Sequence, residues 1–253
     1  MGLTTTLLAF DTSTERLALA LFAPGGPWCV DAAGGALSSS ALLPQAQMLL
    51  ARAGLRLADL GFIAFGRGPG AFTGLRTACA VAQGLAYGVG CPVVPIDSLL
   101  VVAEDARMQA SADERIPFDI GVAMDARMDE AYAAVYRWQC GAWQTLQPPA
   151  LLTLPALNAA WADVALHAVA GSAWSAFGER LPVPGGVPVF AETQRAAALL
   201  RLASQAAADG AGIDAADALP LYLRDKVAFT TQERDALRAA NAAAVPALQR
   251  TAP

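Results

Sequence analysis

The sequence predicts an α/β fold built from two similar halves, and three observations lead to this expectation. Short apolar strands alternate with helix-like segments through the first 110 residues. A strand–aspartate–turn–strand pattern occurs twice, at 9–22 and at 123–136. The composition is that of a globular chain, with 55% hydrophobic and 15% charged residues in 253. We therefore expect two lobes, each a mixed sheet with flanking helices.

In the first half, each expected element has a local signal. An apolar strand ends at Asp11, and an alternating strand follows a polar turn. Serines 38–40 are expected to cap a helix that ends at Gly54, and Thr73 to cap one that stops near Gly88. We expect strands at 7–10, 16–22, 27–33, 61–66 and 91–96, and helices at 41–53, 74–87 and 98–109.

The second half is expected to repeat the first in reduced form. At an offset of 114 residues, Asp11 aligns with Asp125 and Phe22 with Tyr136. Two hairpins could share this pattern by chance, or the lobe is duplicated. Further strands are expected at 141–152 and 164–171, and a helix at 192–210, the last of the second lobe. The predicted limits are a first lobe at 1–110 completed by a segment at about 217–237, a second lobe at 111–216, and a flexible tail at 238–253.

The charge and the cysteines limit the functions that this chain could have. A formal net charge of −5 and the lack of a basic run argue against this chain alone gripping nucleic acid. The four cysteines form no CxxC pair, and His167 is the only histidine, so we expect neither a metal site nor a hydrolase triad. The four cysteines are Cys29, Cys79, Cys91 and Cys140, and three of these four are expected to be buried.

The sequence also carries signals about compartment and membrane association. No signal peptide precedes the first strand, and a reducing cytoplasm is the simplest compartment. The uncharged span 77–96 has the length of a membrane helix, but glycines and prolines interrupt it. We therefore expect a cytoplasmic protein with no membrane segment.

The stretch GRGPGAFTGLR at 66–76 raises the first question about a site. A glycine loop that leads into a helix can bind phosphate through backbone N–H groups. However, no Lys-Ser or Lys-Thr pair follows, and the spacing is not GxGxxG. An anion site and a purely structural turn therefore both stay open. The residues concerned are Gly68, Gly70, Thr73 and Gly74.

The polar turn after the first strand is a second candidate. Asp11, Thr12 and Ser13 could position magnesium-bound water and contact phosphates, or form an Asx turn in a hairpin. Asp125 in the second copy offers the same choice, since Arg127 and Asp129 beside it could simply pair with each other.

The helix after the glycine loop has an unusually small-residue surface. Thr77, Ala80 and Gly84 fall on one face, and Gly88 closes it. Such a face either packs tightly within the chain or lets a helix of a partner approach closely. For a partner interface formed by the helices at 41–53 and 74–87, the expected residues are Leu42, Leu49, Thr77, Ala80, Val81, Gly84 and Tyr87.

With these residues in view, the chain resembles the bacterial TsaB (YeaZ) family. The matching segments are LLAFDTSTE, AFGRGPGAFTGLRTACAVAQGLA, MDARMDEAY and PLYLRDKVAF, which together span most of the chain. The resemblance implies an actin-like (ASKHA) duplicated two-lobe fold. It also implies a non-catalytic paralogue of TsaD in the machinery that forms N6-threonylcarbamoyladenosine at position 37 of tRNAs.

The resemblance further implies partners. A TsaB-like chain pairs with a TsaD-like catalytic subunit through its first-lobe helices, helps recruit a TsaE-like ATPase, and meets tRNA indirectly through the complex. Alone, it could form a homodimer. No intrinsic cofactor is expected, and ATP or ADP is expected only in the assembled complex; Asp11, Asp125 and the glycine loop would then be vestigial nucleotide contacts. The family's first helix usually opens with a histidine near the position of Ser38, and this chain departs from that pattern.

Two rival functions remain at this point. An independent actin-like ATPase or small-molecule kinase would use Asp11, Asp125 and the glycine loop. The peptidase label once attached to the family finds no support in these residues.

Overall fold

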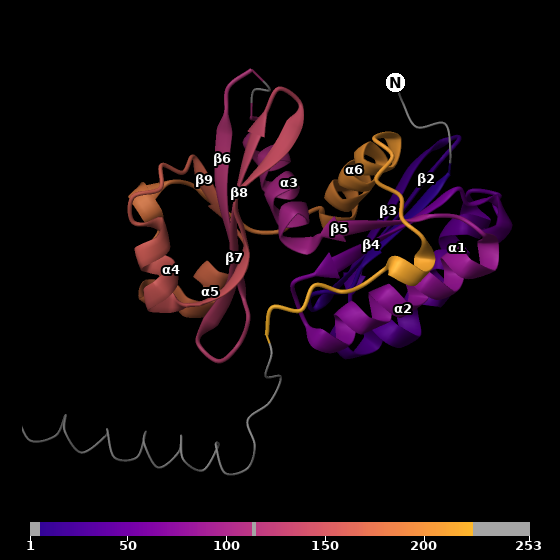
Figure 1. The fold of residues 1–253 in the computed structure, drawn as a ribbon, viewed down its shortest axis with the longest axis horizontal. Coiled ribbons are helices and arrows are strands. Elements are labelled where there is room, and N and C mark those ends of the chain that lie inside the picture. The colour runs from indigo at the N-terminus through magenta and orange to yellow at the C-terminus, as the bar shows by residue number, and fades with distance from the viewer. Residues whose placement is uncertain (1–5, 113–114, 225–253) are drawn as a thin grey trace, which may run out of the picture. The chain divides into compact units, whose positions relative to one another are not determined.

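The computed structural model describes residues 6–112 and 115–224, which form two five-stranded sheets (Figure 1). In the first sheet the order is β3-β2-β1-β4-β5. The first three strands form an antiparallel meander, and β4 and β5 run parallel to β1. Their bounds are β1 (Leu7–Asp11), β2 (Arg16–Ala23), β3 (Gly26–Ala33), β4 (Phe62–Gly68) and β5 (Val93–Asp97).

The second sheet repeats this topology. Its order is β10-β9-β6-β7-β8, with β6, β7 and β8 antiparallel and β9 and β10 parallel to β6. Read as counterparts of β1 to β5, the five strands occupy the same places, so the predicted duplication is confirmed. Their bounds are β6 (Phe118–Asp125), β7 (Glu130–Gln139), β8 (Ala142–Thr153), β9 (Ala168–Ala170) and β10 (Val189–Phe190).

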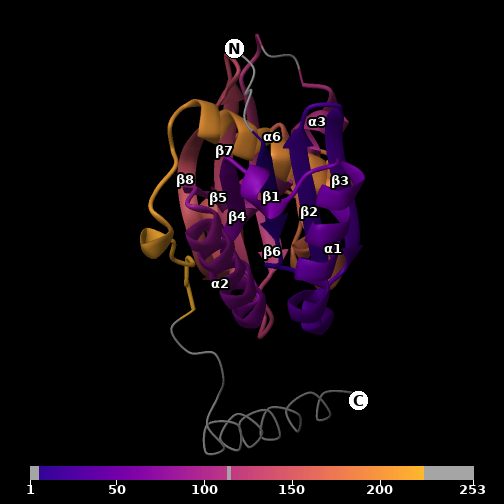
Figure 2. The same cartoon turned by 90° about the vertical axis from the view of Figure 1, so that its right-hand side faces the viewer.

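One face of each sheet is covered by two helices from the same half of the chain. Helices α1 (Ser38–Arg52) and α2 (Phe72–Val89) lie side by side over the first sheet (Figure 2). Their apolar residues pack against Phe10 and Phe65. In the second half, α4 (Leu154–Trp161) and α5 (Ala173–Phe177) pack against β6 and β7. This burial of apolar side chains is the main stabilising contribution in each half.

The remaining two helices are exchanged between the halves. Helix α3 (Ser98–Ala110) follows β5, yet most of its buried apolar residues pack against β6, β7 and β9, while Val101 packs in a core cluster of the first sheet. Helix α6 (Arg195–Ala208) follows β10, yet it packs against β1 and β2. The two helices contact each other between the sheets (Figure 1). The expectation that the helix at 192–210 closes the second lobe is therefore wrong in its packing, while the limits of the lobes stay a prediction.

Several local expectations also change. Helix α1 begins at Ser38 with Leu37 as N-cap, and Ser40 Oγ donates to the Leu37 carbonyl, so the serines lie inside the first turn. Helix α2 has Ala71 as N-cap, without a side-chain cap from Thr73. The expectation of three buried cysteines is wrong. Cys79 is the only one of the four that is buried, whereas Cys91 is half-buried and Cys29 and Cys140 are exposed.

Two predictions reach beyond the described part of the chain. The segment proposed to complete the first lobe is described only to residue 224, and the tail at 238–253 lies outside the described residues. Within the described ranges, no helix has the length and hydropathy needed to cross a membrane.

Candidate functional site

The turn after β1 is a buried Asx turn. The backbone N–H of Ser13 donates to Asp11 Oδ1 at 2.6 Å, and Thr12 Oγ1 donates to the carbonyl of Gly74 at 2.7 Å. All three residues of the turn are at most 2% exposed. The chain spacing Asp-Thr-Ser therefore produces the local turn that short polar side chains favour.

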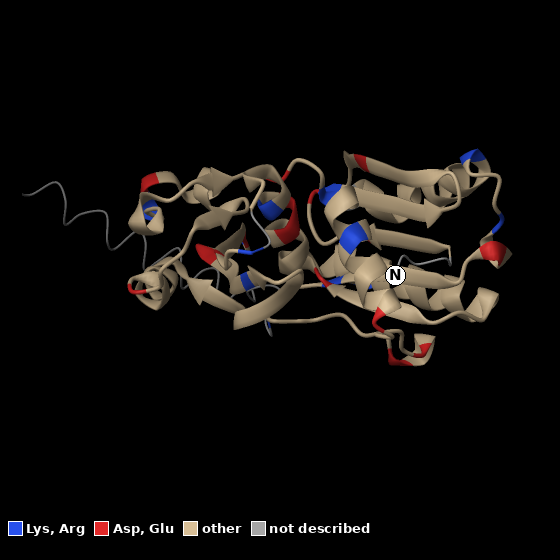
Figure 3. Cartoon of the chain, turned by 90° about the horizontal axis from the view of Figure 1, so that it is seen from above, with Lys and Arg blue, Asp and Glu red and all other residues tan. Residues whose placement is uncertain are grey.

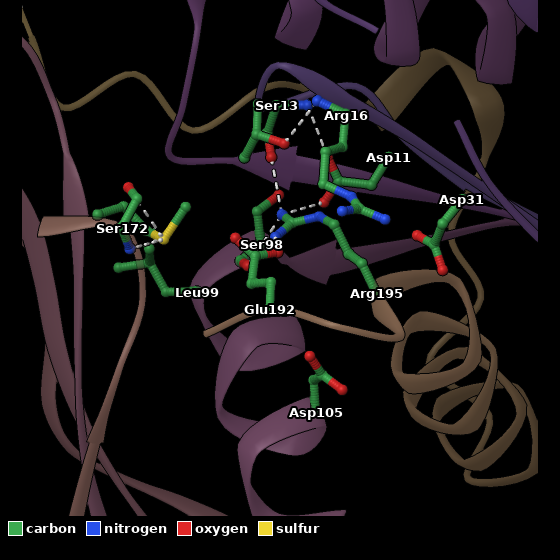
Figure 4. A network of polar contacts seen from close by, with 12 residues as sticks. Asp11, Ser13, Arg16, Asp31, Ser98, Leu99, Asp105, Ser172, Glu192 and Arg195 are labelled. Atoms are coloured by element: carbon green, nitrogen blue, oxygen red, sulfur yellow. Dashed lines mark hydrogen bonds and ion pairs between the residues drawn. The ribbon is translucent and has the colours of Figure 1, made fainter. Parts of the chain in front are cut away.

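The side chain of Arg195 closes this turn, although Arg195 lies 184 residues away from Asp11 in the sequence (Figure 4). Its Nη2 donates to Asp11 Oδ2 at 3.0 Å, to Ser13 Oγ at 2.9 Å and to the Ser98 carbonyl at 3.3 Å. Its Nη1 pairs with Glu192. Since Ser98 begins α3 and Glu192 precedes α6, the guanidinium joins the β1 turn to both chain segments that cross between the sheets.

Burial and charge act in opposite directions on this pair. Burial by itself would raise the pKa of Asp11, but the charge of Arg195 and hydrogen bonds from Ser13 and Ser98 outweigh it, and the pKa is lowered. Burial would lower the pKa of Arg195, but Asp11 and Glu192 outweigh it and the pKa is raised. Both groups are therefore charged, with 0% and 1% of their side chains exposed.

The glycine loop is pressed against the same turn. A Cβ atom on Gly70 would overlap the carbonyl oxygen of Ser13, and one on Gly74 would overlap that of Thr12. Gly68, with φ of 106°, donates its N–H to Ser98 Oγ at 3.1 Å. The N–H of Ala71 donates to Ser13 O at 2.7 Å. The glycines thus permit the close approach of the loop to the turn, as the structural alternative requires, and the anion site stays a prediction.

Asp125 forms the same Asx turn in a different setting. Its Oδ1 accepts from the N–H of Arg127 at 2.7 Å, and its own N–H donates to Ser172 Oγ at 3.0 Å. The Arg127 side chain pairs with Asp125 and also, at 3.3 Å, with Glu15 in the first turn. The two aspartates share no hydrogen-bond partner among the described contacts, and their role as nucleotide contacts stays a prediction.

The partner interface expected from sequence divides into exposed and buried residues. In α2, Ala80, Gly84 and Tyr87 are exposed, Tyr87 by 88%, and Thr77 and Val81 are half-buried. Nothing lies within 4 Å of a Cβ built at Gly84. Within residues 6–112 and 115–224, this side of α2 therefore faces solvent. Thr73, expected in the anion site, is also exposed.

The expectation that two α1 residues belong to the interface is wrong. Leu42 and Leu49 are 0% and 2% exposed and belong to the core under the helix. They sit on the apolar i, i+4, i+7 stripe that α1 turns towards its own sheet. Sequence reasoning missed the apolar residues that α1 and the preceding turn expose instead. These are Leu37, Leu43 and Met48, at 63%, 41% and 60%.

No cluster of three or more His, Cys, Asp or Glu side chains within residues 6–112 and 115–224 has the arrangement of a metal site. The outward faces of α1 and α2 carry exposed small and apolar residues instead. Charged side chains are sparse over most of the described ribbon, which is largely tan in Figure 3.

Comparison with known proteins gives a consistent result. The family described as TsaD, tRNA N6-adenosine threonylcarbamoyltransferase, matches residues 36–157. A Pseudomonas aeruginosa structure described as similar to peptidase YeaZ is 38% identical with a TM-score of 0.77, over 87% of this chain and all of that one. A second structure, YeaZ from the same organism, is 37% identical with a TM-score of 0.74 over the same shares.

Several curated relatives are named TsaB. The Escherichia coli tRNA threonylcarbamoyladenosine biosynthesis protein TsaB is 32% identical over 88% of this chain and 96% of its own length. The Haemophilus influenzae protein of that name is 40% identical over 50% of this chain and 52% of its own. The resemblance noted in the sequence is confirmed by the E. coli match, which spans both sheets, and the chain belongs to the TsaB (YeaZ) family.

Proposed function

We propose that this chain is a non-catalytic subunit of the machinery that forms threonylcarbamoyladenosine in tRNA. It pairs with a TsaD-like catalytic paralogue through the outward faces of α1 and α2 and helps recruit a TsaE-like ATPase. It meets tRNA only through the complex and works in the cytoplasm. Any ATP or ADP binds in the assembled complex.

The observation that carries this proposal is the exposed small-residue side of α2. Ala80 and Gly84 face solvent on a helix whose opposite side is packed on the first sheet. A helix gains nothing for its own fold by keeping this side free of bulky polar residues, but a partner helix can approach it closely. Leu43 and Met48 on α1 add exposed apolar surface beside it.

The Asp11 turn supports a scaffold over an independent ATPase. A catalytic aspartate must present an oxygen to a metal-bound water or a phosphate. Here Oδ1 accepts from Ser13 and Oδ2 from Arg195, and the residue is fully buried. The ion pair supplies internally the positive charge that a bound cation would bring.

A pairing experiment with the purified TsaD-like protein of the same organism tests the proposal. Gly84→Glu places a charged side chain on the docking side. Pairing would bury this carboxylate without a counter-ion, so the variant should weaken pairing by at least about 100-fold. Gly84→Ala keeps the side smooth and should stay within about threefold. Ala160→Glu, on an exposed position of α4, is the matched control and should pair normally.

Transfer activity completes the test. Threonylcarbamoyl transfer to tRNA should need both proteins and follow the pairing of each variant. If Gly84→Glu pairs with the affinity of the unmodified chain while remaining folded, the docking side has been assigned wrongly. If this chain alone modifies tRNA, the non-catalytic role is wrong.

A further inference from the structure

The exposed side of α2 is not uniformly smooth, because it starts at a charged residue. Arg76, Ala80, Gly84 and Tyr87 follow one another at spacings of four, four and three, so they form a single row along the helix. All four are exposed. Arginine and tyrosine are the residue types most enriched at the energetic centres of protein interfaces.

Arg76 is held in place before any partner arrives. Its guanidinium carbon lies 3.9 Å from the centre of the Phe72 ring, one turn earlier. The Nε of Arg76 donates to Tyr222 Oη at 3.2 Å. The ring centres of Phe72 and Tyr222 lie 5.2 Å apart. Tyr222 belongs to the extended segment that runs along α2, fixed there by the bond from Leu221 N–H to Arg67 O at 2.7 Å. With one side stacked and Nε occupied, both Nη groups remain available as a planar fork.

No carboxylate within the described ranges comes within ion-pair distance of Arg76. Neither α1 nor α2 contains an Asp or a Glu, and the charged residues of the two helices are Arg52 and Arg76. The flanking element η5 (Ala215–Asp217) carries Asp217, with Asp214 as its N-cap, but it lies farther along α2, where Gln83 Nε2 donates to Ala218 O.

These observations set a requirement on whatever covers the row. A partner helix that packs on Ala80 and Gly84 removes water from Arg76, and a desolvated guanidinium without a counter-ion is strongly unfavourable. A carboxylate placed against the fork instead gives a bidentate, charge-assisted contact. A basic docking side on a chain of net charge −5 thus calls for an acidic group on the other protein.

We propose that Arg76 is the receptor for a carboxylate of the protein partner, and that Phe72 and Tyr222 position it for that contact. The occupant is the TsaD-like paralogue, so the inference rests on the proposed function. It presents a small or apolar helix surface to Ala80 and Gly84, with an Asp or Glu at the end that meets Arg76. A second copy of this chain is the competing occupant, and it would have to bring an acid from outside α1 and α2.

Titration calorimetry of the full-length chain with the TsaD-like protein, at low and high salt, tests this. Arg76→Gln should weaken pairing by at least about tenfold and reduce the salt dependence of the dissociation constant. Arg76→Lys keeps the charge but loses the planar fork, and should recover only part of the affinity. Tyr222→Phe, which removes one hydrogen bond, should cost about two- to fivefold.

The controls separate this inference from the function it rests on. Arg180→Gln removes an exposed arginine of the second half and should leave pairing unchanged. Thermal unfolding should be alike for all variants. If Gly84→Glu abolishes pairing but Arg76→Gln pairs normally, the carboxylate receptor is refuted and the docking side stands. If both pair normally, the docking side itself is wrong, and the inference with it. If Arg76→Gln changes only self-association, the acid belongs to a second copy and the proposed occupant is wrong.

Discussion

The two copies of the strand–aspartate–turn pattern start from nearly the same sequence and end in different physical situations. Both Asp11 and Asp125 accept a hydrogen bond from the N–H two residues later, at 2.6 and 2.7 Å. In the first copy the glycine loop and Arg195 then bury the turn completely. In the second, the aspartate pairs with Arg127, whose side chain is 72% exposed. The local sequence sets the turn, and the surrounding elements decide whether its charge is structural or merely solvated.

The largest difference is expected when each aspartate is removed. Asp11→Ala takes the main counter-ion from the buried Arg195 and should lower the free energy of unfolding by about 3 kcal/mol or more. Asp125→Ala affects a partly solvated turn and should cost less than about 1 kcal/mol. Urea unfolding of both variants measures this. Equal losses would mean that the two turns are equivalent after all.

The glycines that cover the first turn offer a second test. Gly74→Ala places a methyl group on the Thr12 carbonyl and should destabilise the chain by about 3 kcal/mol through overpacking. On the same helix, Gly84 has open space around it. Gly84→Ala should therefore be neutral or stabilise by up to about 1 kcal/mol, because alanine is the better helix former. Thermal unfolding distinguishes the two, and a tolerated Gly74→Ala would show that the loop can move away from the turn.

The contribution of the Asp11 ion pair to the free energy of unfolding should depend on pH. Because the pKa of Asp11 is lowered in the folded state, its stabilising contribution is present above its unfolded value of about 4. It is lost as the pH falls through the lowered pKa. The stability gap between the unmodified chain and Asp11→Asn should thus be widest near neutral pH and narrow in acid.

For Asp97, the pH dependence of stability should have the opposite sign to that of Asp11. Burial raises its pKa, against hydrogen bonds from Tyr136, Leu99 and Leu100, so the folded state binds a proton more readily than the unfolded state. The unmodified chain should therefore lose stability relative to Asp97→Asn as the pH rises from about 4 through the raised pKa. Chemical unfolding across that range, with both asparagine variants in parallel, gives the two slopes. Slopes of the same sign would contradict the assignment.

The smallest effect is expected at the contact between the two turns. Glu15 and Arg127 are 3.3 Å apart and both largely exposed, at 78% and 72% of their side chains. Exposed pairs contribute little, so Glu15→Gln should change the free energy of unfolding by less than about 0.5 kcal/mol. An effect as large as that of Asp11→Ala would mean that the exposed bridge, and not the buried pair, holds the turns.

Much of the fold could be predicted because it is encoded locally. Leucine and alanine alternate along strand β2, and β4 begins with a short apolar run. In the Asp-Thr-Ser turn, the aspartate side chain accepts a hydrogen bond from the backbone N–H two residues later. Helix α4 was missed although Thr153 and Pro155 mark its start, because its eight residues follow a strand without a glycine break. The burial of Leu42 and Leu49 could have been read from their helical spacing.

The rest could not be predicted from local patterns. An apolar helix stripe shows that a helix packs on a sheet, but not on which sheet, so the exchange of α3 and α6 was invisible. Arg195 sits in an alanine-rich helix with no motif around it, and only the fold brings it to Asp11. A small-residue face with Ala80 and Gly84 was expected on α2, with packing inside the chain and a partner interface both left open. Arg76 was not among the expected residues, because the stack that holds it depends on Tyr222, 146 residues away.

The exchange of α3 and α6 means that neither half of this protein is a module that evolution or an experimenter can lift out. A fragment ending near residue 110 would carry α3 without the second sheet, on which most of its buried apolar residues pack. It would also lack α6, which covers Leu7, Ala20 and their neighbours on one face of the first sheet. A fragment starting there would have the converse fault, with α6 as a loose apolar helix. Each half of the duplicated fold thus lends a helix to the other, and each sheet depends on the other half of the chain to cover one of its faces.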